Sequence, residues 1–161
     1  MIEVAPSLVA VIGTLLGATL VYVFQSRLSA RQVDEARRDR RREDYVDAAT
    51  ALASAVSTLI QSEYDRAKSR FQGIEGEQRD RARRDVYDKR TLTRSATFRL
   101  QLVGSPIEDG HLVLDAEELI RLCRSISTDS ATPADADVRK RAADDALAAL
   151  IGDAHRRVNE I

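Results

Sequence analysis

An uncharged, strongly apolar stretch lies near the start of the chain. From Val4 to Ser26 no residue is charged, and residues 8–24 read LVAVIGTLLGATLVYVF. As a helix this run would be roughly 34 Å long, and the hydrocarbon core of a bilayer is about 30 Å thick. The pattern therefore predicts a transmembrane helix over residues 4–26.

Basic residues lie on only one side of this stretch. Arginines follow it at Arg27, Arg31, Arg37, Arg38, Arg40, Arg41 and Arg42, and no basic residue precedes it. By the positive-inside rule, this arrangement predicts a single-pass protein of the plasma membrane whose carboxyl-terminal domain is cytoplasmic. The cluster around Arg40 could also hold anionic lipid head groups, although the acids among its arginines favour a solvated, topology-setting face.

Three small residues share one face of the predicted membrane helix. Ala10, Gly13 and Gly17 follow the spacing that allows two helices to approach closely in lipid. We therefore expect self-association through this face. The alternative is chance, because glycine is common in membrane helices.

Beyond residue 26 the apolar positions take the period of amphipathic helices. No glycine or proline occurs between Arg27 and Gln72. Apolar residues recur there at steps of three and four, at Tyr45, Ala48, Ala49, Leu52, Val56, Leu59 and Ala67. Residues 27–44 are almost entirely polar, which predicts a charged juxtamembrane stalk helix, or a weak coiled coil, that continues into the apolar pattern.

Three more helices follow, separated by helix-breaking residues. Gly73 and Gly76 precede a helix over 77–103, a third helix covers about 112–127, and Thr132 is placed to cap the last. The expected buried positions are Val86, Leu92, Ala96, Leu100 and Val103, then Leu119, Leu122, Cys123 and Ile126, and finally Val138, Ala142, Leu147, Leu150, Ile151, Ala154 and Val158.

Amphipathic helices joined by short loops must bury their apolar stripes against one another, and strand alternation is absent. The sequence therefore predicts an all-α protein. It consists of one N-terminal transmembrane helix, the long stalk helix, and an antiparallel helical bundle over residues 45–161.

Charge is unevenly distributed, although the formal net charge is only −1. Residues 66–99 are basic and residues 104–161 are acidic. In the second bundle helix, the arginines Arg79, Arg83, Arg84, Arg90 and Arg94 could contact an anionic partner, either the phosphates of nucleic acid, as in direct DNA binding, or an acidic protein. Nucleic acid is not expected, because Tyr87 and Phe98 are the only stacking aromatics nearby. The alternative is that this helix packs against the acidic end of the same bundle.

Catalytic and metal-binding chemistry is sparse. The chain has one cysteine, on an apolar stripe, and two histidines with no triad partners around them. It has no glycine-rich phosphate loop and no paired-histidine motif. We expect no cofactor, no metal and no enzymatic activity.

The run VAVIGTLLGATLVYVFQSR at residues 9–27 passes directly into an arginine-rich helix and an alanine-rich bundle. In this layout the chain resembles the KilB-type plasmid transfer and spread proteins of Streptomyces and related actinobacteria. The resemblance implies a membrane-associated scaffold that serves conjugative plasmid transfer through protein contacts with transfer proteins or with other copies of itself. The alternative is a general membrane-anchored adaptor or cell-envelope regulator, of host or phage origin, with no role in DNA transfer.

Overall fold

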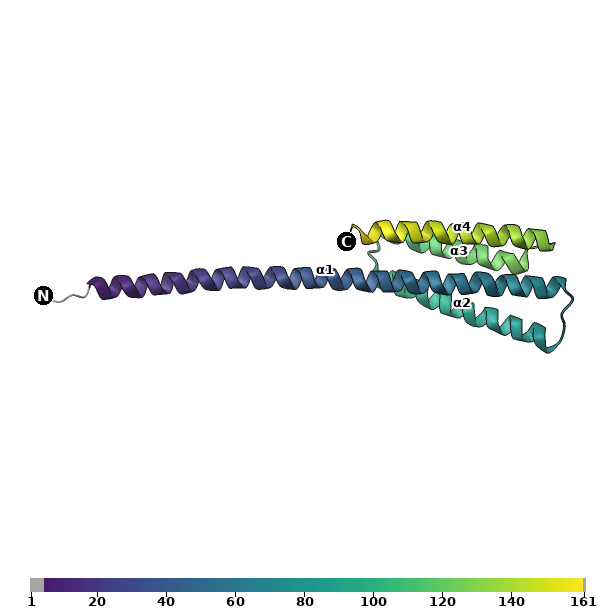
Figure 1. Cartoon of the computed structure of the whole chain (residues 1–161), viewed down its shortest axis with the longest axis horizontal. Helices are drawn as coiled ribbons and strands as arrows, with labels where there is room; N and C mark the ends of the chain where they lie inside the picture. The colour runs from purple at the N-terminus through teal and green to yellow at the C-terminus, as the bar shows by residue number, and fades with distance from the viewer. Residues whose placement is uncertain (1–4, 161) are drawn as a thin grey trace. The chain divides into compact units, whose positions relative to one another are not determined.

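The computed structural model describes the backbone of residues 5–160 and the side chains of Tyr22, Gln25 and residues 32–160. It contains four helices, α1 (Ala5–Phe71), α2 (Glu77–Val103), α3 (Gly110–Thr128) and α4 (Pro133–Val158), shown in Figure 1. Residues 5–160 contain no strand, which confirms the all-α class. The chain divides into two units, residues 1–40 and residues 41–161, and α1 contributes to both.

The predicted membrane localisation is not supported. Among the residues that the structure describes, no helix has a stretch both long and apolar enough to cross a bilayer. A spanning helix needs about 20 mostly apolar residues, whereas the side chains from Gln32 to Asp44 are all exposed and mostly charged. This finding overturns the prediction of a single-pass plasma-membrane protein with a cytoplasmic domain. Apart from Tyr22 and Gln25, the side chains of the predicted segment 4–26 lie outside the described residues, including Ala10, Gly13 and Gly17.

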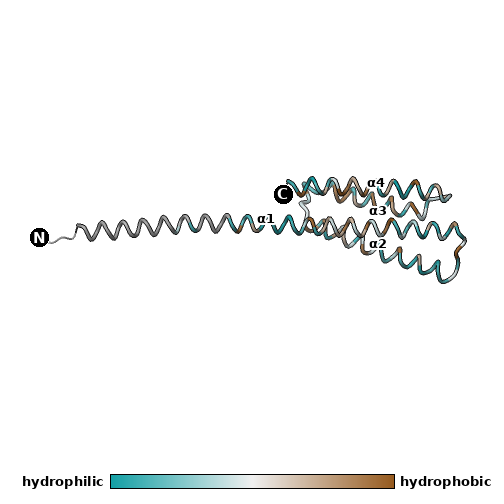
Figure 2. The backbone as a smooth tube through the Cα atoms, viewed as in Figure 1, coloured by the Kyte–Doolittle hydropathy of each residue, from teal (hydrophilic) through white to brown (hydrophobic). Residues whose placement is uncertain are grey.

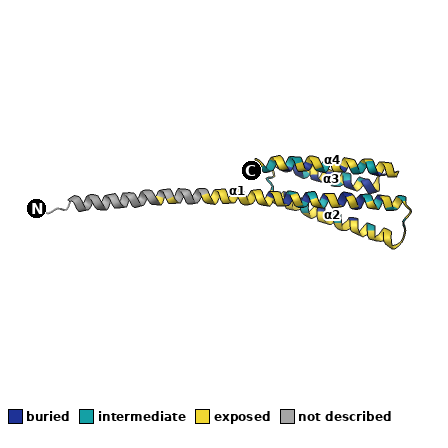
Figure 3. Cartoon of the chain, viewed as in Figure 1, coloured by how far each residue is buried: buried dark blue, intermediate teal, exposed yellow. Residues whose placement is uncertain are grey.

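Residues 41–161 form an antiparallel bundle in which each helix runs opposite to the one before it (Figure 1). α3 packs against both α2 and α4. Apolar and polar positions alternate along each helix of the bundle (Figure 2), and the buried positions lie on the inner sides of the helices (Figure 3). The largest fully buried apolar side chains are Tyr45, Leu52, Leu59, Ile60, Leu100, Leu112, Leu119 and Ile126.

The apolar stripe of α1 is buried as predicted, and that of α2 is buried in part. Val86 and Leu100 are buried and Ala96 packs against the core, as predicted, whereas Leu92 and Val103 are exposed and Thr93 and Thr97 are buried. Each threonine hydroxyl donates to a carbonyl of the preceding turn, 2.9 Å from Thr93 Oγ1 to the Lys89 oxygen and 3.0 Å from Thr97 Oγ1 to the Thr93 oxygen. A threonine that satisfies its hydroxyl in this way can be buried at little cost.

The predicted face of α4 is also buried in part. Leu150 and Ala154 are buried and Leu147 and Val158 pack against the core, as predicted, whereas Val138, Ala142 and Ile151 are exposed. The buried positions of α4 are Ala136, Ala143, Leu150 and Ala154. Three of these four are alanines, whose small side chains allow a helix to lie close to its neighbours. The predicted start is confirmed, because Thr132 and Asp135 form a reciprocal capping box with Pro133 in the first turn.

The connections between helices are fixed by a few residues. Gly73 and Gly76 have φ angles of 66° and 68°, a region that glycine adopts without steric cost, and they reverse the chain between α1 and α2. Between α2 and α3, the buried Asp109 carboxylate accepts hydrogen bonds from the Ser105 backbone N–H and from Arg157 Nε on α4. These contacts tie the second connection to the end of α4.

Candidate anion-binding site

Two adjoining hollows open where the end of α1 meets the start of α2. The larger has a volume of about 640 Å³ and is lined by Arg66, Ser69, Arg70, Gly76, Arg79, Asp80, Ala82, Arg83, Ser127 and Thr128. The smaller, of about 410 Å³, shares Arg66 and Arg83 with it and adds Arg84, Val86, Tyr87, Asp88 and Arg90. We call the side chains of Arg66, Arg79, Arg83 and Arg84 the arginine surface.

The helical hairpin explains why these arginines meet. Arg66 and Arg70 are four residues apart near the end of α1, so they share one side of that helix. Arg79 and Arg83 have the same spacing near the start of α2. The turn at Gly73 and Gly76 folds the two helices against each other and gathers positive charge from both.

The arginines of this surface form no ion pair within the described part of the chain. No carboxylate of the described residues lies within ion-pairing distance of Arg66, Arg79, Arg83 or Arg84, and the acids that line the hollows, Asp80 and Asp88, are outnumbered by arginines. Burial lowers the pKa of Arg66, and the positive charges of Arg90, Arg83 and Arg70 lower it further, against the opposing effect of Glu63. The cluster is therefore a region of concentrated positive potential, which attracts anions.

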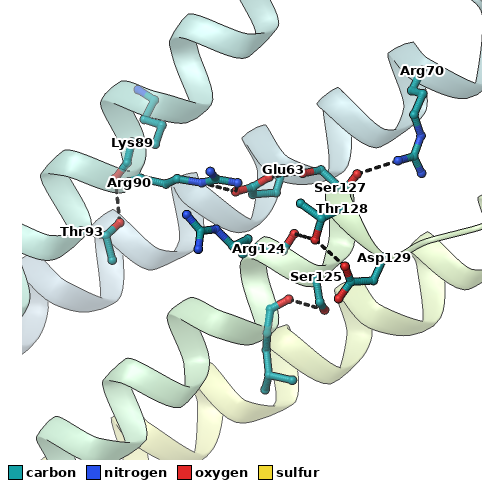
Figure 4. Close-up of polar contacts among 11 residues, drawn as sticks. Glu63, Arg70, Lys89, Arg90, Thr93, Arg124, Ser125, Ser127, Thr128 and Asp129 are labelled. Carbon is teal, nitrogen blue, oxygen red and sulfur yellow. Dashed lines mark hydrogen bonds and ion pairs between the residues drawn. The ribbon is translucent and has the colours of Figure 1, made fainter.

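A buried carboxylate joins three helices (Figure 4), and its partners Arg90 and Ser127 line the hollows. Glu63 on α1 is fully buried, and its Oε1 accepts a hydrogen bond of 2.7 Å from Arg90 Nε on α2. Its Oε2 accepts a hydrogen bond of 2.5 Å from Ser127 Oγ on α3. Arg70 donates from the same side to the backbone carbonyls of Ser127 and Ser130. The network holds α1, α2 and α3 in register beneath the hollows.

The structure brings together most of the arginines predicted to contact an anionic partner. Arg79, Arg83 and Arg84 line the hollows, and Arg94 is exposed farther along α2. Arg90 differs, because its guanidinium is held by Glu63, 2.5 Å from Nη2 to Oε1, and is only partly exposed. Arg90 is therefore a positioning residue for the surface more than a free cation.

Sequence reasoning missed the contribution of α1. In the sequence, Arg66 and Arg70 belong to the end of the first long helix, apart from the arginines of α2. Only the pairing of α1 with α2 brings them to the same hollow as Arg79 and Arg83. Glu63 did carry a signal, because it stands where the buried stripe of Val56, Leu59 and Ala67 requires an apolar residue. A carboxylate on the buried face of a helix predicts a charged partner from another helix.

The alternative pairing of α2 with the acidic end of the bundle is not observed. In the described residues no ion pair joins α2 to α4. Within α4, Lys140 pairs with Asp144 and Arg156 with Asp153. Arg157 pairs with the α2–α3 connection through Glu108 and Asp109. The ion pairs of α4 are thus made within α4 or with the α2–α3 connection, and none of them involves the arginine surface.

The arginines predicted to orient a membrane helix form no comparable site. Arg37, Arg38, Arg40, Arg41 and Arg42 are all exposed on α1. Arg37 lies 4.0 Å from Asp34, and both side chains are largely exposed, so the pair contributes little stability. The side chains of Arg27 and Arg31 lie outside the described residues.

The groups able to do covalent or metal chemistry are dispersed in the described part of the chain. Cys123 is buried, and burial raises the pKa of its thiol to about 12, so it stays protonated at neutral pH. His111 lies at the start of α3 and His155 near the end of α4, and both are exposed. No group of three His, Cys, Asp or Glu residues among those described could hold a metal ion.

The chain was compared with known proteins in three ways. A family model described as KilB plasmid transfer protein matches residues 46–158, which include the whole arginine surface. No curated protein and no solved structure matches the chain.

Proposed function

This chain belongs to the KilB plasmid transfer protein family, and from that premise we propose that it serves plasmid transfer as a non-covalent binding module. In this proposal the bundle is a rigid scaffold, and the arginine surface holds an anionic partner of the transfer system. The work is assembly, without a covalent step.

The observation that carries this proposal is the unpaired charge of Arg66, Arg79, Arg83 and Arg84 around two adjoining hollows. Placing like charges together raises the energy of the free protein, and a bound anion would relieve that repulsion. Arginine also suits the role chemically, because its planar guanidinium binds carboxylate or phosphate with two parallel hydrogen bonds.

The family also favours this proposal over a general envelope adaptor and over an enzyme. A plasmid transfer family argues against a general envelope adaptor, and it suggests a non-enzymatic protein. The buried, protonated Cys123 supports the same conclusion, because a thiolate is the reactive form of cysteine.

The first prediction tests the arginine surface in transfer. The gene for this chain is deleted from its plasmid, and the triple variant Arg79→Glu, Arg83→Glu, Arg84→Glu is supplied in its place. The frequency of plasmid transfer is then measured in matings. We expect a loss of at least about tenfold, because reversing the charges replaces attraction of an anion by repulsion.

The matched control reverses three exposed arginines elsewhere in the bundle, Arg121→Glu, Arg141→Glu and Arg156→Glu. Both variants change the net charge equally, and circular dichroism checks that both are helical. If the folded surface variant transfers as well as the control, the arginine surface is not the binding site. If deletion of the gene leaves transfer unchanged, the envelope adaptor replaces the transfer role.

A further inference from the structure

A second feature extends from the arginine surface along α2. Arg84, Tyr87, Thr91, Arg94 and Phe98 follow one another at steps of three and four residues, and all five are exposed. Residues at these steps share one face of a helix. We call this face the α2 stripe. From Arg84 to Phe98 it is about 21 Å long by the standard helical rise.

The two aromatic rings of the stripe are unusually accessible. Tyr87 is 71% exposed and Phe98 is 56% exposed. Elsewhere in residues 41–160 the aromatic side chains are packed, since Tyr45 is buried and Tyr64 and Phe71 are half-buried. The bundle thus keeps its other rings in or against the core and leaves these two in water, where exposed apolar area has a cost.

The stripe is continuous with the arginine surface. Arg84 and Tyr87 both line the smaller hollow, which reaches Arg83 and Arg66. A single extended ligand lying along α2 could therefore contact the hollow arginines first and then Arg94 and Phe98. Thr91 and Arg94 interrupt the apolar positions, so the face does not offer the unbroken aliphatic stripe that a partner helix requires.

We propose that the arginine surface and the α2 stripe together bind single-stranded nucleic acid. Arginines contact phosphates, and exposed rings stack on bases, which is the combination that single strands use. In a duplex each base already stacks on its neighbours, so Tyr87 and Phe98 could engage base faces only in a single strand. Few exposed aromatics were evident in the sequence, but the structure places both on the same face as unpaired arginines. This inference rests on the proposed function and names its anionic partner.

The second prediction concerns the purified full-length chain and a fluorescein-labelled 20-mer of thymidine, followed by fluorescence anisotropy. We expect binding that weakens with added NaCl, with a log–log slope of about −3.5 if Arg94 and the four arginines of the surface each neutralise one phosphate. Replacing both Arg83→Ala and Arg84→Ala should make this slope shallower by about 1.4.

The aromatic variants separate stacking from charge. Tyr87→Ala and Phe98→Ala should each weaken binding by about fivefold to a hundredfold with the salt slope unchanged. Tyr87→Phe and Phe98→Tyr keep the rings and should bind as the natural chain does. Leu92→Ala is the matched control, because Leu92 is similarly exposed on another face of α2.

The remaining outcomes distinguish failure of the single-strand inference from failure of the proposed function. Unchanged binding in both ring-to-alanine variants, or equal affinity for a duplex 20-mer, would overturn the single-strand inference. Tighter binding of a labelled polyglutamate peptide than of DNA would overturn it in favour of an acidic protein. In either case a transfer loss in the charge-reversal variant would leave the proposed function standing. DNA binding without any transfer loss would contradict the proposed function alone.

Discussion

Glu63 is the residue on which the bundle's polar interior depends. A carboxylate removed from water is costly unless it is paired and hydrogen-bonded, and Glu63 has both kinds of partner, in Arg90 and Ser127. The surface pairs are different in kind. Arg99 and Asp47 lie 3.9 Å apart with both side chains more than half exposed, so solvent screens most of their attraction.

The third prediction follows from this contrast. Arg90→Ala should lower the free energy of unfolding by about 3 kcal/mol, because it leaves the Glu63 carboxylate buried without its cation. Arg99→Ala should change the free energy of unfolding by less than about 0.5 kcal/mol. Urea denaturation followed by circular dichroism measures both.

A double variant tests the explanation itself. Glu63→Leu with Arg90→Met removes both charges together and should recover much of the lost stability, since no unpaired charge then stays buried. If the double variant is less stable than Arg90→Ala alone, packing around Glu63 and not charge pairing accounts for its importance.

At the scale of the helical elements, the bounds of α2 and the start of α4 could be predicted closely, whereas their buried faces could be predicted only in part. Gly73, Gly76 and Gly104 mark the ends of α2 through backbone chemistry that acts locally. Which face turns inward depends on neighbouring helices and on whether a polar residue satisfies itself, as Thr93 does through its bond to the Lys89 carbonyl. Pattern reasoning counts threonine as polar and therefore favoured Leu92.

The candidate site also combines residues that could be predicted from the sequence with one that could not. Arg79, Arg83 and Arg84 were predictable because they are close together in sequence on one helix. Arg66 comes from α1, and only the pairing of the two helices brings it to the same hollow. No local pattern contains that information.

The fourth prediction compares glycines in two kinds of element. Gly76→Ala should destabilise the bundle by about 1 kcal/mol, because φ is 68° there and a Cβ atom makes this conformation unfavourable. Gly152→Ala, inside α4, should stabilise the bundle by about 0.5–1 kcal/mol. The added Cβ at residue 152 would meet only Arg156 Nη1, at 3.9 Å. Thermal unfolding should therefore move in opposite directions, and equal shifts would contradict this account of the turn.

For the whole molecule, the family match and the packed core coincide. The family model covers residues 46–158, and every residue of the core cluster lies between Tyr45 and Val158. The material for a stable fold is thus contained in the second unit. The roles predicted for residues 4–26 and 27–44 as membrane and stalk segments were inferred from composition, which carries no packing information of this kind.

The fifth prediction is that a shortened chain beginning at Arg41 folds as stably as the full-length protein. Its midpoint in urea should agree with that of the complete chain, because no core residue is lost. A chain beginning at Ala53 is the control. It lacks Tyr45, Ala48 and Leu52, which are fully buried, and should lose several kcal/mol of unfolding free energy. Equal midpoints for the two shortened chains would show that the first turns of the bundle are dispensable.

The buried carboxylate near the arginine surface also bears on how tightly that surface can hold its partner. Glu63 lies close enough to Arg66 to raise its pKa, so its carboxylate, although paired with Arg90, offsets part of the positive charge that Arg66 presents to an incoming anion. A ligand that never touches Glu63 would still bind less tightly because of this electrostatic effect. A protein that serves plasmid transfer must release its partner, and a buried carboxylate near the binding surface would favour rapid release over long residence. Affinity could then be adjusted in evolution from inside the bundle, with the contact surface left intact.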